Sequence, residues 1–372
     1  MMQCDVIVTY CWNRVGYNII HSLYNLGLKV VVGDTSNKNI CSMSKYSVDN
    51  FVYADPFTDE CHFIKDIQKA VEQYKPKVVI PTHDESLVLA RNIDAFPKNV
   101  IFAMESYDLL NQLSNKYEST ILANSVGVPC PAFIENYENH SFPIVIKTRY
   151  GNSAKGVFFP KTKEETDHIC KQYSKEDIII EEFFPGTDYS VDCVRFKDFF
   201  KASSYKAIVT KTDGGGTTTQ RIIVSMPQLE EYSKKILDKV NYNGVCGLDF
   251  KVNEDTGESA FIEVNARYTG GLATPIAAGF DIPAIHYELV TTGHYAKPIQ
   301  IKIGTHTKWI LGDIIALVTK VVQRTLKKDE LKHIISFKAD AFDDFKKDDK
   351  KAILGEMLYY FEKLIQNRKL NP

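Results

Sequence analysis

The first third of the chain alternates short apolar runs with amphipathic segments. Apolar runs at 5–10, 30–34 and 77–80 predict buried strands, and helical spacing at 15–29 and 69–74 predicts helices between them. Strands that alternate with helices pair in parallel, and ligands lie near the carboxyl ends of such strands. The segment Thr-His-Asp-Glu that follows the third strand is therefore a candidate for binding a substrate ammonium group, with a solvated turn or helix cap as the alternative.

The pattern changes in the middle of the chain. Residues 105–128 have helical spacing and end at Gly127 and Pro129. Short strands and turns follow, which predicts an α+β region with antiparallel pairs at 142–160, 177–196, 201–225 and 244–267 and a helix near 228–241. From about residue 306 the chain is mostly helical, and its charge runs are typical of solvated helix faces.

Length and composition narrow the class of protein. The 372 residues suggest two or three domains, and 45 basic against 47 acidic residues give no surplus of positive charge for nucleic acid. The eight cysteines form no CxxC pair, which favours reduced thiols, and the run at 309–318 is too short to span a membrane. No secretory leader is evident, so we expect a cytoplasmic protein without nucleic-acid or membrane partners.

One predicted strand carries an unusual set of polar side chains. Glu263, Asn265 and Arg267 stand two residues apart, so all three point to one face, while small apolar residues fill the other. Asp249 lies on the preceding strand. Carboxylate and amide oxygens suit Mg²⁺, and the guanidinium could stabilise the charge of a transferring phosphoryl group. The alternative is the polar outer face of an amphipathic strand.

Two further segments could bind a nucleotide. Lys147 ends an apolar strand before a Gly/Ser loop with Ser153 and Lys155, where backbone N–H groups could approach phosphate, although an ordinary hairpin tip has the same composition. Glu181 and Glu182 end a very apolar strand, where a buried carboxylate needs a partner such as the adenine amine or the ribose hydroxyls. Alternatively, these acids emerge into solvent. Neither GxxxxGK[ST] nor GxGxxG occurs, which disfavours a P-loop and a nicotinamide site.

In this order, these features resemble the ATP-grasp superfamily of ligases. The resemblance covers roughly residues 110–280, and its most specific part is the E-x-N-x-R signature after an acid-bearing strand. It implies a parallel α/β domain before the grasp, a two-lobed α+β module and a helical extension. The implied boundaries are a pre-ATP-grasp domain at 1–108, a small lobe with the adenine hinge at 109–190, a large lobe with the metal site at 191–305, and the extension at 306–372.

The resemblance also implies a role for each matching residue. Two Mg²⁺ ions, or Mn²⁺ in their place, would be held by Asp249, Glu263 and Asn265, and Arg267 would face an acyl phosphate. Nucleotide contacts would come from Lys116, Lys147, Ser153, Lys155, Glu181 or Glu182, Phe183, Phe184 and Asp188. Lys211 or Arg221, which flank a tip of three glycines, would add catalytic donors.

The implied activity is an ATP-dependent joining of a carboxylate to an amine, with ADP and phosphate released. Gly247 stands where D-alanine–D-alanine ligases place an arginine, so that assignment is disfavoured. The substrates stay open, as does a homodimer. A non-catalytic ATP-binding protein and a phosphotransferase on the same fold remain as alternatives.

Overall fold

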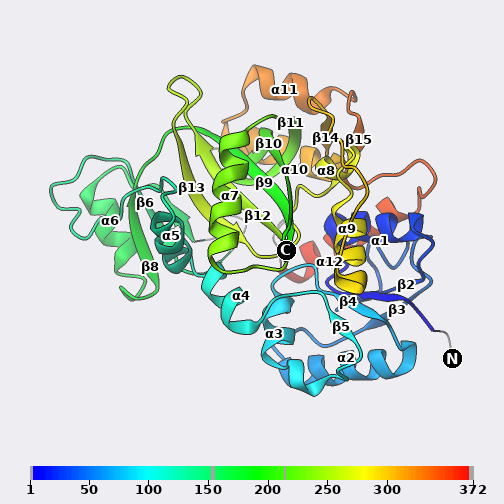
Figure 1. The fold of residues 1–372 in the computed structure, drawn as a ribbon. Helices are drawn as coiled ribbons and strands as arrows, with labels where there is room; N and C mark the ends of the chain where they lie inside the picture. The colour runs from blue at the N-terminus through cyan, green and yellow to red at the C-terminus, as the bar shows by residue number, and fades with distance from the viewer. Residues whose placement is uncertain (1–2, 152–155, 213–214, 368–372) are drawn as a thin grey trace.

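The computed structural model describes residues 3–151, 156–212 and 215–367. Its first domain is a parallel five-stranded sheet in the order β3-β2-β1-β4-β5, with helices on both faces (Figure 1). The predicted α/β fold of this domain is confirmed. The strands are β1 (Val6–Val8), β2 (Val30–Asp34), β3 (Asp49–Val52), β4 (Val78–Ile80) and β5 (Ile101–Phe102). The helices are α1 (Arg14–Asn25), α2 (Glu60–Tyr74), α3 (Glu85–Arg91) and the 3-10 turn η1 (Ile93–Ala95).

A three-stranded antiparallel sheet, β7-β6-β8, forms a smaller unit on the left of Figure 1. Its strands are β6 (Ile144–Thr148), β7 (Val157–Phe158) and β8 (Ile178–Glu182), and the neighbouring helices are α4 (Tyr107–Ser114), α5 (Lys116–Ser125) and α6 (Lys163–Cys170). The hairpin predicted from 142–160 is therefore present. The loop residues Ser153 and Lys155 lie outside the described residues.

The largest sheet has seven strands in the order β13-β12-β9-β10-β11-β14-β15. Its pairs are antiparallel except β14 with β15, which is parallel. The strands are β9 (Thr187–Phe196), β10 (Phe199–Thr212), β11 (Gly215–Val224), β12 (Gly244–Val252), β13 (Ser259–Asn265), β14 (His306–Lys308) and β15 (Ala341–Phe342). The helices that accompany it are α7 (Pro227–Lys239), α8 (Ala273–Ala277), α9 (Ile282–Thr292), α10 (Ile310–Gln323), α11 (Lys328–Ile335) and α12 (Ala352–Asn367).

The C-terminal extension is mostly helical, as the sequence predicts, but it also supplies β14 and β15 to the largest sheet. The boundary expected near residue 306 consequently falls inside that sheet. These strands are only three and two residues long, so the alternation along them gives little signal.

The first domain and the largest sheet share a hydrophobic core. Ile19 and Ile20 of α1 belong to the same cluster of buried side chains as Ile285 and Leu289 of α9. This packing fixes the carboxyl ends of β1 and β4 relative to β13, and it brings loops of the first domain to the polar face of the largest sheet. Within the described residues, no helix is long and apolar enough to cross a membrane.

Candidate active site

The acidic centre of the site is formed by two neighbouring strands. Asp249 of β12 and Glu263 of β13 are directly opposite in the antiparallel register, as are Gly247 and Asn265. Opposed residues of such a pair share one face of the sheet, so the side chains of Asp249, Glu263 and Asn265 point the same way. The amide of Asn265 donates to Asp249 Oδ2 at 3.0 Å, and the Ser190 hydroxyl donates to Oδ1.

The electrostatics of this centre are those of an incompletely neutralised acidic pair. Burial and the nearby charge of Glu263 raise the pKa of Asp249 to about 7, although the Ser190 hydrogen bond acts in the opposite direction. A carboxyl group whose ionised form is disfavoured in this way is stabilised by an added cation. Among the described residues, no group of three or more His, Cys, Asp or Glu side chains is arranged to hold a metal ion. The donors present are two carboxylates and one amide oxygen, so Mg²⁺ bound here would take its remaining oxygens from phosphate or water.

Lys116 reaches this centre from the start of α5. The Asn115 side chain caps the helix by accepting from the N–H groups of Tyr117 and Glu118, and this makes Lys116 the first helical residue. Its ammonium lies 3.4 Å from Glu263 Oε2 and donates to the Gly151 carbonyl at 2.6 Å. The amino end of a helix carries partial positive charge, so a lysine there does not stabilise the helix. Together, the lysine and the helix end favour binding of an anion.

Lys147 and Glu181 form a second, buried pair in the three-stranded sheet. Val145 is opposite Glu181 and Lys147 is opposite Ile179, so the lysine and the glutamate share a face at diagonal positions. The ammonium lies 2.6 Å from Glu181 Oε2, and both side chains are nearly inaccessible to solvent. Glu182 points the other way and is half-exposed beside His140. The register thus separates the two acids that the sequence alone could not distinguish.

Other predicted nucleotide contacts lie near the end of β8. The Phe183 ring is exposed and meets Phe159 edge-on at 6.2 Å between ring centroids, and Phe184 is partly buried. Asp188 is ion-paired with Lys251 at 2.6 Å. The adenine contacts of Phe183 and Phe184 and the ribose contact of Asp188 stay predictions.

The prediction that Arg267 shares the strand of Glu263 and Asn265 is wrong, because β13 ends at Asn265 and the chain turns there. Arg267 instead links this end of the sheet to the first domain. Its Nε donates to Asp84 Oδ1 at 2.8 Å. A pocket of about 110 Å³ lies beside this pair, and its lining includes Asp84, Lys116, Glu263, Asn265 and Arg267. The polar residues predicted at two-residue spacing thus meet one cavity between the first domain and both sheets.

Some predicted residues are placed differently. Glu85 is buried and accepts hydrogen bonds from the Thr9 hydroxyl and from the N–H groups of Thr82 and His83. It stabilises the loop, and the expectation of an ammonium-binding role for it is wrong.

The two predicted donors beside the glycine tip have other partners. Arg221 is buried and paired with Asp343 at 2.8 Å, and the Lys211 ammonium lies 4.5 Å from the centroid of the Trp309 ring. The Asp343 pair and the Trp309 contact lie outside the acidic centre of Asp249 and Glu263, so the catalytic role of both donors stays a prediction.

Gly247 occupies the position where D-alanine–D-alanine ligases have an arginine. A Cβ atom here would lie 2.1 Å from Thr269 Cγ2 and 3.0 Å from Asp192 Oδ1. The Thr269 hydroxyl donates to Asp192 at 2.8 Å and fills the space that a longer side chain would need. The departure from that ligase pattern therefore has a local packing cause.

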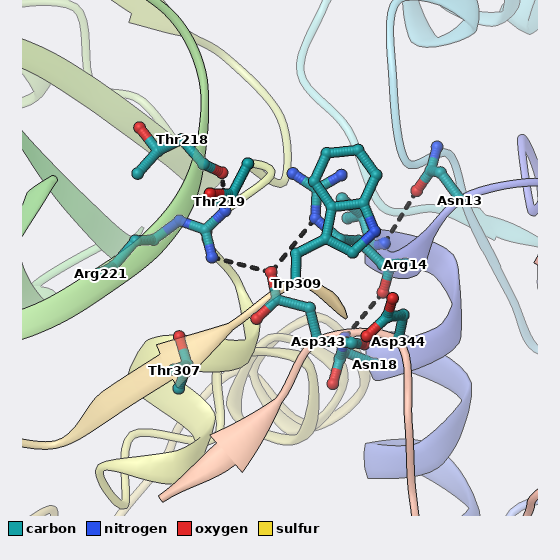
Figure 2. Close-up of polar contacts among 12 residues, drawn as sticks. Asn13, Arg14, Asn18, Thr218, Thr219, Arg221, Thr307, Trp309, Asp343 and Asp344 are labelled. Carbon is teal, nitrogen blue, oxygen red and sulfur yellow. Dashed lines mark hydrogen bonds and ion pairs between the residues drawn. The ribbon is translucent and has the colours of Figure 1, made fainter. Parts of the chain in front are cut away.

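Sequence reasoning missed Arg14, Asp343 and Trp309, which gather next to this site (Figure 2). Arg14 follows β1 at its carboxyl end, in the position where open α/β sheets bind ligands, and this rule could have singled it out. Asp343 is 329 residues away in the chain and carried no local signal.

Comparison with known proteins agrees with this geometry. Residues 174–312 match the family described as "ATP-grasp in the biosynthetic pathway with Ter operon", and residues 103–195 match the "RimK-like ATP-grasp domain". The chain belongs to the ATP-grasp superfamily. Together the two ATP-grasp matches cover both antiparallel sheets up to the start of α10, and they include every predicted metal and nucleotide residue.

Individual relatives are more distant. A D-alanine–D-alanine ligase of Fusobacterium nucleatum is 26% identical over 163 residues, which are 41% of this chain and 55% of that ligase. Two solved structures share the ATP-grasp fold. The biotin carboxylase domain of Hydrogenobacter thermophilus 2-oxoglutarate carboxylase, a complex with MgADP and bicarbonate, has a TM-score of 0.65 at 14% identity and covers 82% of this chain and 74% of that one. An L-amino acid ligase from Bacillus licheniformis has a TM-score of 0.63 at 15% identity, covering 78% and 75%.

Proposed function

We propose that this protein is an ATP-dependent ligase that activates a carboxylate as an acyl phosphate and joins it to an amine. The observation that carries the proposal is the shared face of Asp249, Glu263 and Asn265, with Lys116 and Arg267 at the same pocket. The similarity to a D-alanine–D-alanine ligase and to an L-amino acid ligase supports an amino acid as one substrate.

In the first step, an oxygen of the substrate carboxylate attacks the γ-phosphorus of ATP, and the bond to the β,γ-bridging oxygen breaks to release ADP. Lys116 and Lys147 would offset the negative charge of the phosphates. Mg²⁺ held by Asp249, Glu263 and Asn265 would supply further charge neutralisation when bound. The buried Lys147–Glu181 pair would fix the lysine in one conformation while the glutamate meets the adenine side of the nucleotide.

In the second step, the amine attacks the acyl carbon, and phosphate leaves with the bonding electron pair as the amine loses a proton. Negative charge develops on the acyl oxygen in the transition state. Arg267 would stabilise this charge, because its guanidinium is held at the pocket by Asp84. The acyl phosphate is prone to hydrolysis, so water has to be excluded from the pocket during this step.

The decisive experiment measures ADP release with amino-acid pairs and small carboxylates, with products identified by mass spectrometry. Glu263→Ala and Asn265→Ala should abolish substrate-dependent ADP release and leave the fold intact. Glu258→Ala, which removes an exposed glutamate just before the same strand, is the matched control and should retain turnover. Full turnover in both site variants contradicts the proposal.

Hydroxylamine separates the ligase from a phosphotransferase. It converts an acyl phosphate into a hydroxamate, whereas a stable phosphoester does not react. Binding of MgATP without ADP release across the whole substrate panel would instead indicate a non-catalytic nucleotide-binding protein.

A further inference from the structure

Next to the candidate active site, three distant segments meet in a buried charge cluster that we call the Arg14–Arg221–Asp343 cluster (Figure 2). Arg14 begins α1, Arg221 lies on β11, and Asp343 directly follows β15. Both arginines bind the same oxygen: Arg14 Nε is 3.2 Å and Arg221 Nη1 is 2.8 Å from Asp343 Oδ2. All three side chains are at least nine-tenths buried.

The positive charge of the cluster is least compensated at Arg14. Burial lowers the pKa of Arg221, but the charges of Asp343 and Asp192 outweigh it and raise that pKa, so Arg221 has its counterions. Burial and the charge of Arg221 lower the pKa of Arg14, while Asp343 opposes them. Glu356 does not supply the missing anion, because burial and the charge of Asp344 raise its pKa and favour its neutral form. A buried cation without a full counterion is costly, so an anionic ligand would stabilise this arrangement.

The free end of Arg14 faces the turn that follows β13. Asp343 engages Nε, and among the described residues neither Nη1 nor Nη2 of Arg14 donates to an acceptor. The guanidinium carbon lies 3.7 Å from the centroid of the Trp309 ring, which holds the plane of the group. Nη2 approaches Gly270, where a Cβ atom would lie only 2.8 Å away. Gly270 is three residues beyond Arg267, so the unpaired donors lie beside the turn that follows the metal-binding strand.

We propose that the two terminal nitrogens of Arg14, held against Trp309, bind a carboxylate group of an amino-acid substrate, and that Asp343 is the positioning residue. This inference rests on the proposed ligase function. The planar fork of arginine matches the two oxygens of a carboxylate, and burial strengthens such a charged pair. Because Asp343 binds Nε, the Nη1–Nη2 edge stays available. The C-terminal extension, which supplies Asp343 and Trp309, thereby becomes part of the substrate site.

Trp309 provides a direct reporter for this site. The chain has only two tryptophans, so Trp12→Phe leaves Trp309 as the single tryptophan, which can be excited selectively over the tyrosines. In this background, we would titrate the standard amino acids and D-alanine, each against its carboxamide, with and without MgADP. At least one carboxylate should change the emission in a saturable way, and its carboxamide should not. Arg14→Gln should raise the apparent Kd of that carboxylate roughly tenfold or more, as expected for lost charged hydrogen bonds.

Asp343→Asn tests positioning separately from folding. It should reduce the discrimination between carboxylate and carboxamide while the Kd of MgADP, measured by calorimetry, stays unchanged. Arg195→Gln is the matched control, because Arg195 is another buried arginine paired with an aspartate, Asp238, at 2.7 Å, and it should leave the discrimination intact.

Two results would overturn the inference: no carboxylate in the panel affects Trp309, or Arg14→Gln binds the responding carboxylate as tightly as the parent. Neither depends on catalysis. Failure of MgADP to bind the parent protein would instead count against the proposed ligase function, so the two failures are distinguishable.

Discussion

Arg267, two residues beyond the end of β13, is joined to Asp84 of the first domain by a hydrogen-bonded ion pair of 2.8 Å. The two residues are 183 positions apart in the chain, and the contact fixes the guanidinium at the pocket that also contains Lys116 and Glu263. The first domain thus contributes directly to the position of a predicted catalytic group.

This contact predicts separate effects on turnover and stability. Arg267→Ala should lower turnover by about 10²–10³-fold, the usual cost of removing a group that stabilises transition-state charge. Asp84→Asn should lower turnover less and should change the free energy of unfolding by less than about 1 kcal/mol, since the Asp84 side chain is one-third exposed. Steady-state ADP release and urea denaturation measure the two quantities. Arg91→Ala, which breaks an exposed pair with Glu60 in the same domain, should leave turnover unchanged.

For the buried Lys147–Glu181 pair, we expect substitutions to have a large effect on stability. Lys147→Met leaves the Glu181 carboxylate buried without a cation, and we expect a loss of about 3–5 kcal/mol in the free energy of unfolding. The double variant Lys147→Met/Glu181→Leu should recover most of that stability, because two apolar side chains of similar size replace the pair. Nucleotide affinity should stay low in both variants.

The exposed neighbour provides the control for this pair. Glu182→Gln should leave the urea midpoint unchanged, because the Glu182 side chain is about half-exposed and not paired with Lys147. A double variant that recovers stability together with full nucleotide affinity would show that Lys147 serves the fold alone.

Gly270→Ala offers an independent test of the Arg14 carboxylate site. The new Cβ would stand 2.8 Å from Arg14 Nη2, so we expect the flexible guanidinium to move and the backbone of the turn to keep its place. We expect weaker binding of the carboxylate that shifts Trp309 emission. In a double-mutant cycle with Arg14→Gln, the two losses should not add, because both act through the same group. Full additivity would mean that Gly270 acts by another route.

The part of the site that the sequence predicts is the part that local geometry determines. Alternation along β13 places Glu263 and Asn265 on one face irrespective of the rest of the fold, whereas Arg267 lies beyond the end of the strand and is held by Asp84. The alternation of strands and helices likewise predicts the parallel sheet of the first domain, because it reflects burial on both faces.

Contacts between residues far apart in the chain could not be predicted from the sequence. Asp343 meets Arg14 and Arg221 only after the C-terminal extension adds β14 and β15 to the largest sheet. Its sequence context is a charged run, which is indistinguishable from a solvated helix face. The choice between Glu181 and Glu182 depended on strand register, and a shift of one residue exchanges the two faces.

The raised pKa of Asp249 predicts how stability depends on pH. Asp249 has a pKa of about 7 in the folded protein without metal, against an ordinary value of 3.8 in the unfolded chain. Between these values the folded state binds more protons than the unfolded state, so the contribution of Asp249 to stability falls as pH rises from about 4 to about 7. Asp192 has the same direction of shift through burial, so total stability alone does not isolate Asp249.

The comparison that isolates it uses Asp249→Asn and magnesium. Relative to the parent protein, Asp249→Asn should gain thermal stability between pH 5 and pH 8, because the amide carries no charge to desolvate. Mg²⁺ with ADP should raise the melting temperature of the parent at pH 8 more than at pH 5, since ionised Asp249 is the form that binds a cation. Asp192→Asn should retain this magnesium effect, whereas Asp249→Asn should lose it. An equal response of both variants to magnesium would mean that Asp249 is not a metal ligand, and the acidic pair of β12 and β13 would need another explanation.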